Sequence, residues 1–487
     1  MNLGFKKIKT AQLLGSLPGL LLYLSAFIFP QLYPVPQTFM IALGIAALMI
    51  NLWIAEPIPI WLTSLLPLVL LPLHGVFEIN SALANYYSKN ILLFFGGFIL
   101  AYSIEKWNLH QRFAYKLLSL TGSNPKGIVL GTMISTFTIS MWISNTATAI
   151  MILPVVMSIV KIAQKEVNVD LKPFYICLTL GVAYGANIGG IATLIGTPPN
   201  LVYKGYVQEL LKSDISFLQW MLFAFPIAIL MLWLSYWLMT NFIFKMDKTP
   251  LPEVAKFLDE QTYVKAKLSS TEKRVLLIFG LAVFFWIFLQ PVNALIKLLG
   301  LGFKLEEHSI ALFFGFLLFI VPSGSSKEKQ LIHLKDLKYI SWDILILFGG
   351  GLCMAKGLEA TGVITWFGEI IHHGFSDNFY LLSFLLILTA LFLTELMSNV
   401  ALTQIFIPVI FGVCSSIGLE NPHQLGVPVT IAASFAFMFP ISTPPNAVVY
   451  SSGLIKIKDM VKAGIILNIV GVFILWLSSL YILPYLF

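Results

Sequence analysis

Apolar stretches long enough to cross a lipid bilayer recur along almost the whole chain, with short polar segments between them. A transmembrane helix needs about 20 predominantly apolar residues, and Phe223–Phe244 and Ile465–Phe487 reach that length. The pattern predicts about eleven membrane-spanning helices, two of which are interrupted. The nine uninterrupted spans are predicted at 13–30, 38–55, 58–73, 90–106, 220–244, 274–298, 306–322, 341–358 and 463–485.

Four apolar stretches carry polar residues or prolines in their middle and are not expected to be straight helices. The stretches 127–160 and 379–416 are predicted to be re-entrant hairpins. The stretches 174–210 and 427–455 each contain Thr-Pro-Pro-Asn and are predicted to be broken helices, because proline lacks an N–H and disfavours helical geometry before it. A broken helix exposes carbonyls that suit a cation and N–H groups that suit an anion.

These interruptions occur as two matched pairs. Ser144–Asn145 in the first hairpin is repeated as Ser398–Asn399, 254 residues later. Thr197–Asn200 in the first broken helix is repeated as Thr443–Asn446, 246 residues later. Each repeat has an odd number of predicted crossings, so the two copies are expected to have opposite orientations in the membrane. Inverted repeats with paired interruptions are typical of secondary transporters.

A purely structural interpretation of these motifs is weaker. Proline can kink a helix, and serine or threonine can donate to a carbonyl of its own helix. That interpretation accounts for one such motif but poorly for four in two matched pairs. Buried polar groups in a membrane need partners, so the motifs indicate a binding site.

Composition and charge support a membrane protein with a defined orientation. The chain is 58% hydrophobic and 11% charged, whereas soluble domains are about 25% charged. With a cytoplasmic N-terminus and re-entrant hairpins, the cytoplasmic segments hold 24 of the 30 Lys and Arg residues, as the positive-inside rule requires. The C-terminus would then lie outside. These segments are 1–10, 106–126, 161–172, 245–274, 323–340 and 456–462.

The net charge of +7 therefore reflects orientation, and no nucleic-acid binding is predicted. No cleavable signal peptide is evident after the basic first ten residues. The chain is predicted to be an integral protein of a membrane, most simply a bacterial inner (plasma) membrane.

The doubled Ser-Asn and Thr-Pro-Pro-Asn motifs resemble those of the divalent anion:sodium symporter family, the INDY-like di- and tricarboxylate transporters. The resemblance covers nearly the whole chain and implies a homodimer of elevator transporters. It implies a scaffold domain from 1–126 and 274–378, a mobile transport domain from 127–244 and 379–487, and a cytoplasmic linker at 245–273.

The resemblance also implies at least two sodium sites with a substrate between them. The first sodium would be held by Ser140, Ser144, Asn145 and Gly196. The second would be held by Thr394, Met397, Asn399 and Ser442, with Met397 contributing its carbonyl. The substrate carboxylates would contact Asn145, Thr146, Thr197, Pro198, Asn399, Thr443 and Pro444.

Two residues of the second hairpin, Val400 and Glu395, differ from their counterparts in the first hairpin. Val400 stands where the first hairpin has Thr146, so one hydroxyl that could contact the anion is missing. Glu395 is the only acid in either hairpin, and an intramembrane carboxylate is a functional candidate by default. Its counterpart in the first repeat is Met141, which favours a bracing role for Glu395. No Lys or Arg lies in the two Ser-Asn or the two Thr-Pro-Pro-Asn motifs, so bound sodium would have to neutralise a dianion.

We expect sodium-coupled symport of C4 dicarboxylates such as succinate, malate or fumarate. The alternatives are a sodium-independent dicarboxylate exchanger, a proton-coupled carrier that uses Glu395, or citrate or sulfate as substrate. An anion channel is a further alternative. A membrane enzyme is the least favoured class, because the sequence has no nucleophile elbow, phosphate-binding loop or His/Cys/Asp/Glu cluster.

Overall fold

The structure is a computed structural model that describes residues 10–29, 31, 33–122, 124–164, 171–246, 250–260, 267–326, 328–375 and 378–486. Within these residues the regular elements are all helices, and one isolated β-bridge joins Pro322 to Gln330. Parts of the predicted cytoplasmic segments 1–10, 161–172, 245–274 and 323–340 lie outside the described residues.

Seven helices in the described part of the chain are long and apolar enough to cross a membrane, and two bent pairs can raise the number to nine. The all-helical polytopic class is therefore confirmed. Three of the seven are α2 (Gln37–Ala55), α10 (Lys172–Ile191) and α24 (Ile457–Tyr481). Two are hairpin arms, α9 (Asn145–Ala163) and α21 (Asn399–Ser416). Two are composite: α5 (Ile79–Ala84), η2 (Asn85–Tyr87) and α6 (Lys89–Lys106) form one, and α12 (Phe217–Leu238) with the π-helical turn η3 (Met239–Ile243) forms the other.

One predicted span is wrong as a single straight helix. The span 274–298 is α15 (Ser270–Ile287) followed by α16 (Leu289–Leu298), with a bend of 78° between them. Pro291 lies four residues after Ile287, and a proline ring cannot share a helix with the carbonyl four residues earlier. The predicted span 341–358 is the single helix α18 (Trp342–Ala360), and the chain bends by 75° only after it, at Gly362 of positive φ, before α19 (Val363–Phe375).

The remaining helices are shorter. The predicted span 58–73 is divided into α3 (Ile60–Thr63) and α4 (Leu66–Leu73), with Pro67 at the start of the second helix. The apolar helices α17 (Glu307–Ile320) and α20 (Phe379–Leu393) are also short, whereas α1 (Thr10–Ile28) has 19 residues. Six of the described helices lie where no span was predicted, because they are short or lie in segments with many polar residues. They are α5, η2, α7 (Leu109–Leu120), α13 (Pro252–Asp259), the 3-10 helix η4 (Leu334–Tyr339) and α19. The short helix α25 (Leu483–Leu486) overlaps the end of the predicted span 463–485.

The four interrupted stretches are present. The first hairpin is α8 (Pro125–Ser140) and α9, and the second is α20 and α21. The first broken helix is α10 and α11 (Pro198–Leu210), and the second is α22 (His423–Ala432) and α23 (Pro444–Tyr450).

The internal repeat is visible in the starting residues of the helices. Pro125 of α8 and Phe379 of α20 are 254 residues apart, as are the first residues of α9 and α21. Pro198 of α11 and Pro444 of α23 are 246 residues apart, as the motifs predict. The repeat therefore extends from the motifs to the helices that carry them.

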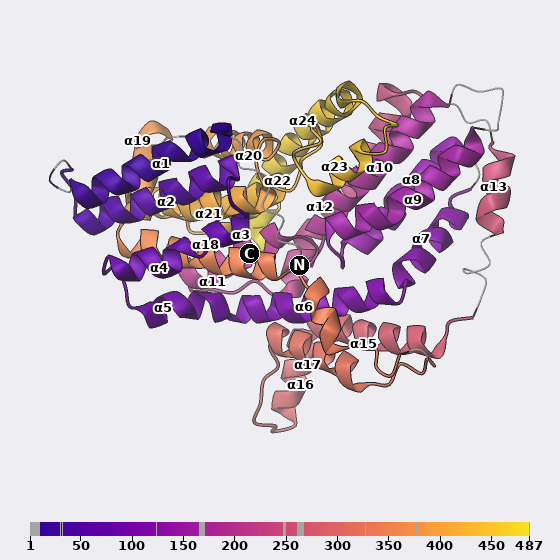
Figure 1. Ribbon diagram of the computed structural model, residues 1–487, viewed down its shortest axis with the longest axis horizontal. Coiled ribbons are helices and arrows are strands. Elements are labelled where there is room, and N and C mark those ends of the chain that lie inside the picture. Colours follow the sequence, from indigo (N-terminus) through magenta and orange to yellow (C-terminus); the bar gives the residue numbers. More distant parts are fainter. Residues whose placement is uncertain are drawn as a thin grey trace.

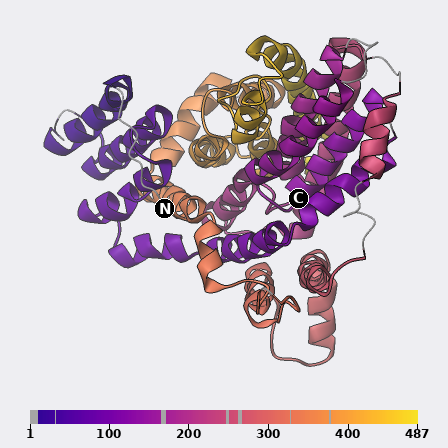
Figure 2. The ribbon, with the colours of Figure 1, turned by 45° about the vertical axis from the view of Figure 1, so that its right-hand side comes forward.

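Helix α10 runs through the middle of the molecule, between α8 and α9 on one side and α23 and α24 on the other (Figure 1). The group α15–α17 projects from one edge of the molecule in both ribbon views (Figure 2). Helices α1 and α2 lie together at one end.

Three glycines allow α10 to pack very closely against α8. Gly181, Gly185 and Gly189 are spaced four residues apart and lie on one face of α10. A Cβ atom added to Gly185 would lie 2.9 Å from the carbonyl oxygen of Met133, and one added to Gly189 would overlap the backbone of Phe137. Small residues at this spacing let membrane helices approach backbone to backbone, so we call this contact the glycine seam.

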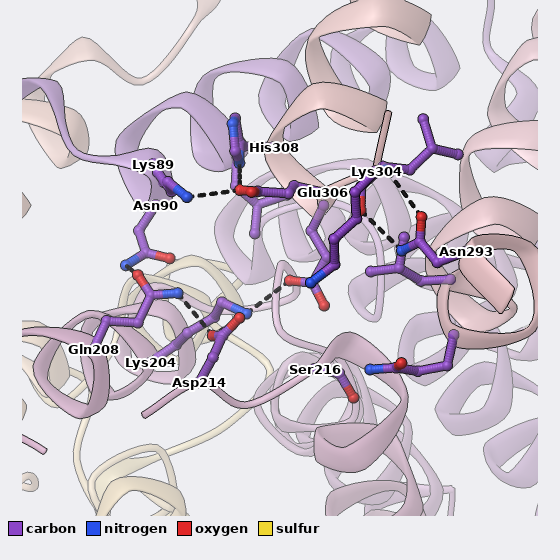
Figure 3. A pocket seen from close by; sticks show the side chains of 15 residues that line it. Lys89, Asn90, Lys204, Gln208, Asp214, Ser216, Asn293, Lys304, Glu306 and His308 are labelled. Atoms are coloured by element: carbon purple, nitrogen blue, oxygen red, sulfur yellow. Dashed lines mark hydrogen bonds and ion pairs between the residues drawn. The ribbon is translucent and has the colours of Figure 1, made fainter. Parts of the chain in front are cut away.

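A polar cavity of about 290 Å³ lies at the junction of α6, α11, α16 and α17 (Figure 3). The Lys204 ammonium is inside it, with only 3% of its side chain exposed, and forms ion pairs with Asp214 at 2.9 Å and Glu307 at 2.7 Å. Lys89 at the rim pairs with Glu306 at 2.8 Å.

Six of the 30 Lys and Arg residues lie outside the predicted cytoplasmic segments, and all six are lysines. Four of these lysines form ion pairs with carboxylates: Lys89, Lys204, Lys212 and Lys356. Their charges are balanced locally, so they do not argue against the orientation predicted from the other lysines.

The buried ion pair of Lys204 predicts a stability difference between two lysine substitutions. Lys204→Met leaves the carboxylate of Glu307 buried without its cation, which costs about 3–5 kcal/mol for such pairs. Lys212→Met removes a lysine that is 69% exposed and 3.8 Å from Glu209, an interaction of about 1 kcal/mol or less. Thermal unfolding of both purified variants in detergent should show a much larger loss for Lys204→Met. Equal losses would contradict the structural role of this ion pair.

Candidate functional site

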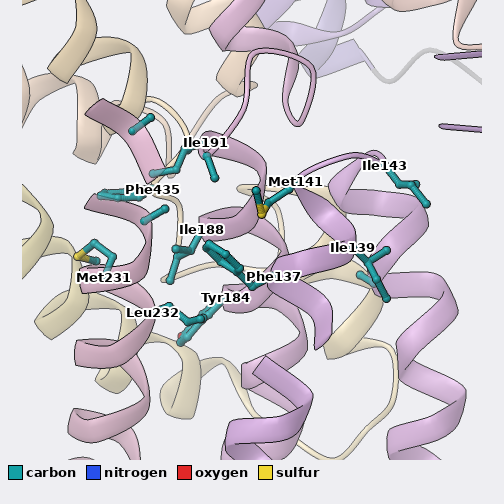
Figure 4. Close-up of a cluster of buried hydrophobic side chains, with 14 of the residues drawn as sticks. Phe137, Ile139, Met141, Ile143, Tyr184, Ile188, Ile191, Met231, Leu232 and Phe435 are labelled. Atoms are coloured by element: carbon teal, nitrogen blue, oxygen red, sulfur yellow. The ribbon is translucent and has the colours of Figure 1, made fainter. Parts of the chain in front are cut away.

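The first half-site lies where the tip of the first hairpin meets the first broken helix. Ser140 is the last residue of α8 and Asn145 is the first residue of α9. The Ser140 hydroxyl lies 2.8 Å from Asn145 Oδ1 and 2.9 Å from the carbonyl oxygen of Ala186 on α10. One buried hydroxyl thus connects both arms of the hairpin to the broken helix. The surrounding core includes Phe137, Met141, Tyr184, Ile188 and Ile191 (Figure 4).

Glycines bring the break itself against this tip. A Cβ atom at Gly190 would collide with the side-chain amide of Asn145. A Cβ atom at Gly196 would lie 2.5 Å from the carbonyl oxygen of Gly190 and 3.0 Å from that of Met141. The structure therefore brings together Ser140, Asn145 and Gly196 of the predicted first sodium set. Ser144, the fourth member, caps α9, where its hydroxyl accepts a hydrogen bond from the Ala147 N–H at 3.3 Å.

The second half-site repeats the same hydroxyl arrangement. The Thr394 hydroxyl lies 2.8 Å from Asn399 Oδ1 and 2.5 Å from the carbonyl oxygen of Ala433. Thr394 corresponds to Ser140 and Asn399 to Asn145 at the offset of 254, and Ala433 follows Ala186 by 247 residues. The repeat predicted from the motifs therefore extends to individual hydrogen bonds.

The asparagine of each Thr-Pro-Pro-Asn motif holds the break in its bent shape. Asn200 Nδ2 donates to the carbonyl oxygens of Gly190 at 3.0 Å and Thr193 at 2.7 Å. Asn446 Nδ2 donates to those of Ala436 and Phe439, both at 3.0 Å. In both repeats the acceptors lie 10 and 7 residues before the asparagine. The sequence analysis assigned these asparagines no role, although their place in the motif marked them.

Glu395 distinguishes the second half-site from the first. Its Oε1 accepts hydrogen bonds from the N–H groups of Phe437 at 2.7 Å and Met438 at 2.9 Å, and from Asn468 Nδ2 on α24 at 2.7 Å. Its Oε2 accepts one from the Ser442 hydroxyl at 2.5 Å. An ionised carboxylate is a pure acceptor, and four donor groups surround this one. These four contacts support the bracing role that the sequence favours.

Of the other residues predicted to bind the second sodium, Ser442 contacts Glu395. The Ser442 hydroxyl is also 3.0 Å from the carbonyl oxygen of Glu395, so it is attached to the hairpin by two contacts. Met397 and Val400 are partly buried, and both side chains pack against the hydrophobic clusters. Apolar packing thus takes the place of the hydroxyl that Val400 lacks.

A side chain that sequence reasoning missed connects the two halves. Asn187 of α10 is fully buried, and its Nδ2 lies 3.0 Å from the carbonyl oxygen of Ala436, 3.3 Å from Thr443 Oγ1 and 3.4 Å from Asn446 Oδ1. Tyr184, one turn earlier, donates to the carbonyl oxygen of Phe437 at 2.9 Å. Among the described residues no hydrogen bond joins the two hairpin tips directly. The only sequence signal was a single amide in an apolar segment.

The predicted substrate residues are distributed over both repeats. Thr197 and Thr443 are buried at the starts of α11 and α23, and Asn145, Thr146, Pro198 and Asn399 are partly buried, whereas Pro444 is exposed. Helix α23 packs against α9 of the first hairpin, and α11 packs against α21 of the second. Each break therefore lies beside the hairpin of the other repeat.

The donor set at both half-sites consists of hydroxyl, amide and carbonyl oxygens, which are the ligands that hard cations prefer. No Lys or Arg lies in the tip or break segments. These residues fit sodium as a transported ion.

Comparison with known proteins agrees with this geometry. The family model described as "Sodium:sulfate symporter transmembrane region" matches residues 11–485. A sodium-dependent dicarboxylate transporter of Staphylococcus saprophyticus is 35% identical over 98% of this chain and 93% of its own length. One of Staphylococcus aureus strain MRSA252 is also 35% identical, over 98% of this chain and 92% of its own. The chain therefore belongs to the sodium:sulfate symporter family, the divalent anion:sodium symporters whose doubled motifs it shares.

Proposed function

We propose that this protein is a secondary active transporter that couples uptake of C4 dicarboxylates, such as succinate, malate or fumarate, to sodium. The observation that carries the proposal is the matched pair of half-sites, each with a hydroxyl fixed between a side-chain amide and a carbonyl. The printed names of the relatives, sodium-dependent dicarboxylate transporters, support the same ion and substrate class.

The charge of the site gives sodium coupling a physical reason. A dicarboxylate carries two negative charges, and the tip and break segments contain no basic residue. Without bound cations the dianion would be uncompensated in a medium of low dielectric constant. Sodium and dicarboxylate should therefore bind cooperatively, and each should raise the affinity for the other.

The architecture is proposed to be that of a homodimeric elevator. In this arrangement 1–126 and 274–378 form the scaffold, and 127–244 and 379–487 form the transport domain. The glycine seam between α8 and α10 supports placing the first hairpin and the first broken helix in one moving unit. The protein would reside in a bacterial plasma membrane with its N-terminus in the cytoplasm and its C-terminus outside.

A proton-coupled carrier that uses Glu395 is the second candidate. The four donors around the carboxylate support a fixed brace instead, since a protonated carboxyl would place its own donor among them. Sodium-independent exchange is the other alternative for the same fold.

Removing either half-site hydroxyl should weaken sodium binding. In proteoliposomes, Ser140→Ala or Thr394→Ala should raise the sodium concentration for half-maximal succinate uptake several-fold, because each hydroxyl contributes about 0.5–1.5 kcal/mol per hydrogen bond. Ser158→Ala is the matched control, because that hydroxyl donates to the carbonyl of Pro154 along α9, away from the tip. If succinate binds equally well to the wild-type protein without sodium, the symporter proposal is wrong and exchange takes its place.

Val400 offers a test of the substrate shell. Val400→Thr would supply the hydroxyl present at Thr146 and should change succinate affinity by about 0.5–1.5 kcal/mol, or change the preference for succinate over citrate. Competition of labelled succinate uptake by unlabelled succinate, citrate and sulfate measures both effects. An unchanged competition profile would place residue 400 outside the substrate shell.

Glu395→Gln tests the brace against proton coupling. The amide keeps the size of the side chain but places an NH2 group among four donors, so thermal stability should fall by about 1.5–3 kcal/mol and uptake should fall with it. Glu369→Gln on the exposed face of α19 is the control. A stable Glu395→Gln protein whose uptake has merely lost its dependence on pH would favour the proton-coupled carrier.

A further inference from the structure

We propose that Asn187 is a positioning residue that orients the Thr443 hydroxyl as a hydrogen-bond donor to a substrate carboxylate. The inference deepens the proposed function and rests on it, since Thr443 is placed in the substrate shell there. It adds a residue outside the doubled motifs, on α10 of the opposite repeat.

A hydroxyl group has one donor and two acceptor lone pairs. Thr443 Oγ1 accepts from the N–H of Asn446 at 3.3 Å and from Asn187 Nδ2 at 3.3 Å. Both acceptor positions are then used by groups that can only donate. The O–H proton of Thr443 must point away from both, and it is free to donate to a ligand.

The orientation of the Asn187 amide is fixed by its neighbours. Its Nδ2 lies 3.0 Å from the carbonyl oxygen of Ala436, which can only accept. Turning the amide over would place Oδ1 against that carbonyl and against Asn446 Oδ1, which lies 3.4 Å from the present Nδ2 position. In this orientation Asn187 can only donate to Thr443 and cannot accept a hydrogen bond from it, and its two N–H groups are shared among Ala436 O, Thr443 Oγ1 and Asn446 Oδ1.

The described residues of the first repeat show no contact equivalent to that between Asn187 and Thr443. Thr197, the counterpart of Thr443, makes no side-chain capping bond at the start of α11. The counterpart of Asn187 is Ser434, because Ala186 and Ala433 accept the two half-site hydroxyls. The Ser434 hydroxyl is buried and has no hydrogen-bond partner in the structure. The oriented hydroxyl of Thr443 therefore belongs to the second repeat. This is the repeat in which Val400 replaces the hydroxyl that Thr146 supplies in the first.

The proposed ligand group is a carboxylate oxygen. A neutral donor held in one direction before the ligand arrives recognises an acceptor without adding a fixed positive charge, and no reorientation is needed on binding. In the second half-site Thr443 is then the hydroxyl that can donate to the dicarboxylate, while Ser442 is attached to Glu395. Loss of the Asn187 contact would leave the Thr443 proton free to turn toward other acceptors.

The test measures sodium-driven succinate uptake by Asn187→Ser, which introduces the residue found at position 434 and is too short to reach Thr443. The KM for succinate at saturating sodium should rise about threefold to tenfold, the equivalent of one hydrogen bond, with maximal uptake within about twofold. The double variant Asn187→Ser/Thr443→Val should have the same KM as Thr443→Val alone, since both substitutions remove one interaction.

Thr179→Val is the matched control, because Thr179 is buried on the same helix two turns earlier and its hydroxyl has no partner. Its KM should be that of the wild-type protein. A purely structural role of Asn187 would lower maximal uptake and protein yield and would add to the effect of Thr443→Val. An additive double variant, or an unchanged KM for Asn187→Ser, would overturn the proposal.

Asn187→Asp provides the second variant, because a carboxylate at this position can only accept and would draw the Thr443 proton toward itself. It should raise KM in the same way, with folding checked by gel filtration in detergent. Failure of both variants to fold would also overturn the proposal, since Asn187 would then serve the fold. If the wild-type protein takes up no succinate under a sodium gradient, the proposed function fails first, whatever Asn187 does.

Discussion

A single buried hydroxyl in each repeat holds the centre of this protein together. It lies within hydrogen-bond distance of an asparagine side chain across the hairpin tip and of a backbone carbonyl of the neighbouring broken helix. In a membrane interior such groups have no water to bind, so they must satisfy one another. The tips, the breaks and the proposed ion sites all depend on this local exchange of hydrogen bonds.

The sequence predicted the parts of the fold that repeat. Two offsets, 254 and 246 residues, anticipated the starts of α20, α21 and α23, because proline and buried polar residues leave strong local signals. Pro291 was a sequence signal for the bend between α15 and α16. The segment was nevertheless predicted to be one helix, because its apolar stretch is long enough for a single span. Helix α7 was overlooked because an amphipathic helix lies below any threshold set for membrane spans.

The partners of the site residues were harder to predict. Glu395 receives a hydrogen bond from Asn468, 73 residues later, and Asn187 reaches Asn446 from 259 residues away. Composition and spacing indicate which buried polar side chains need hydrogen-bond partners. Which residue becomes the partner depends on how the helices pack. The two repeats consequently differ in their contacts at positions that look equivalent in the sequence, with a carboxylate at Glu395 and a thioether at Met141.

The glycine seam limits the ways in which the site can open. With α8 and α10 already backbone to backbone at Gly185 and Gly189, neither helix can slide inward, and swinging α8 away would strip a long apolar contact and break the Ser140 link to Ala186. A flap-like gate made from this hairpin arm is therefore mechanically unfavourable. In the proposed elevator mechanism, the first hairpin and the first broken helix would therefore move together as one rigid unit.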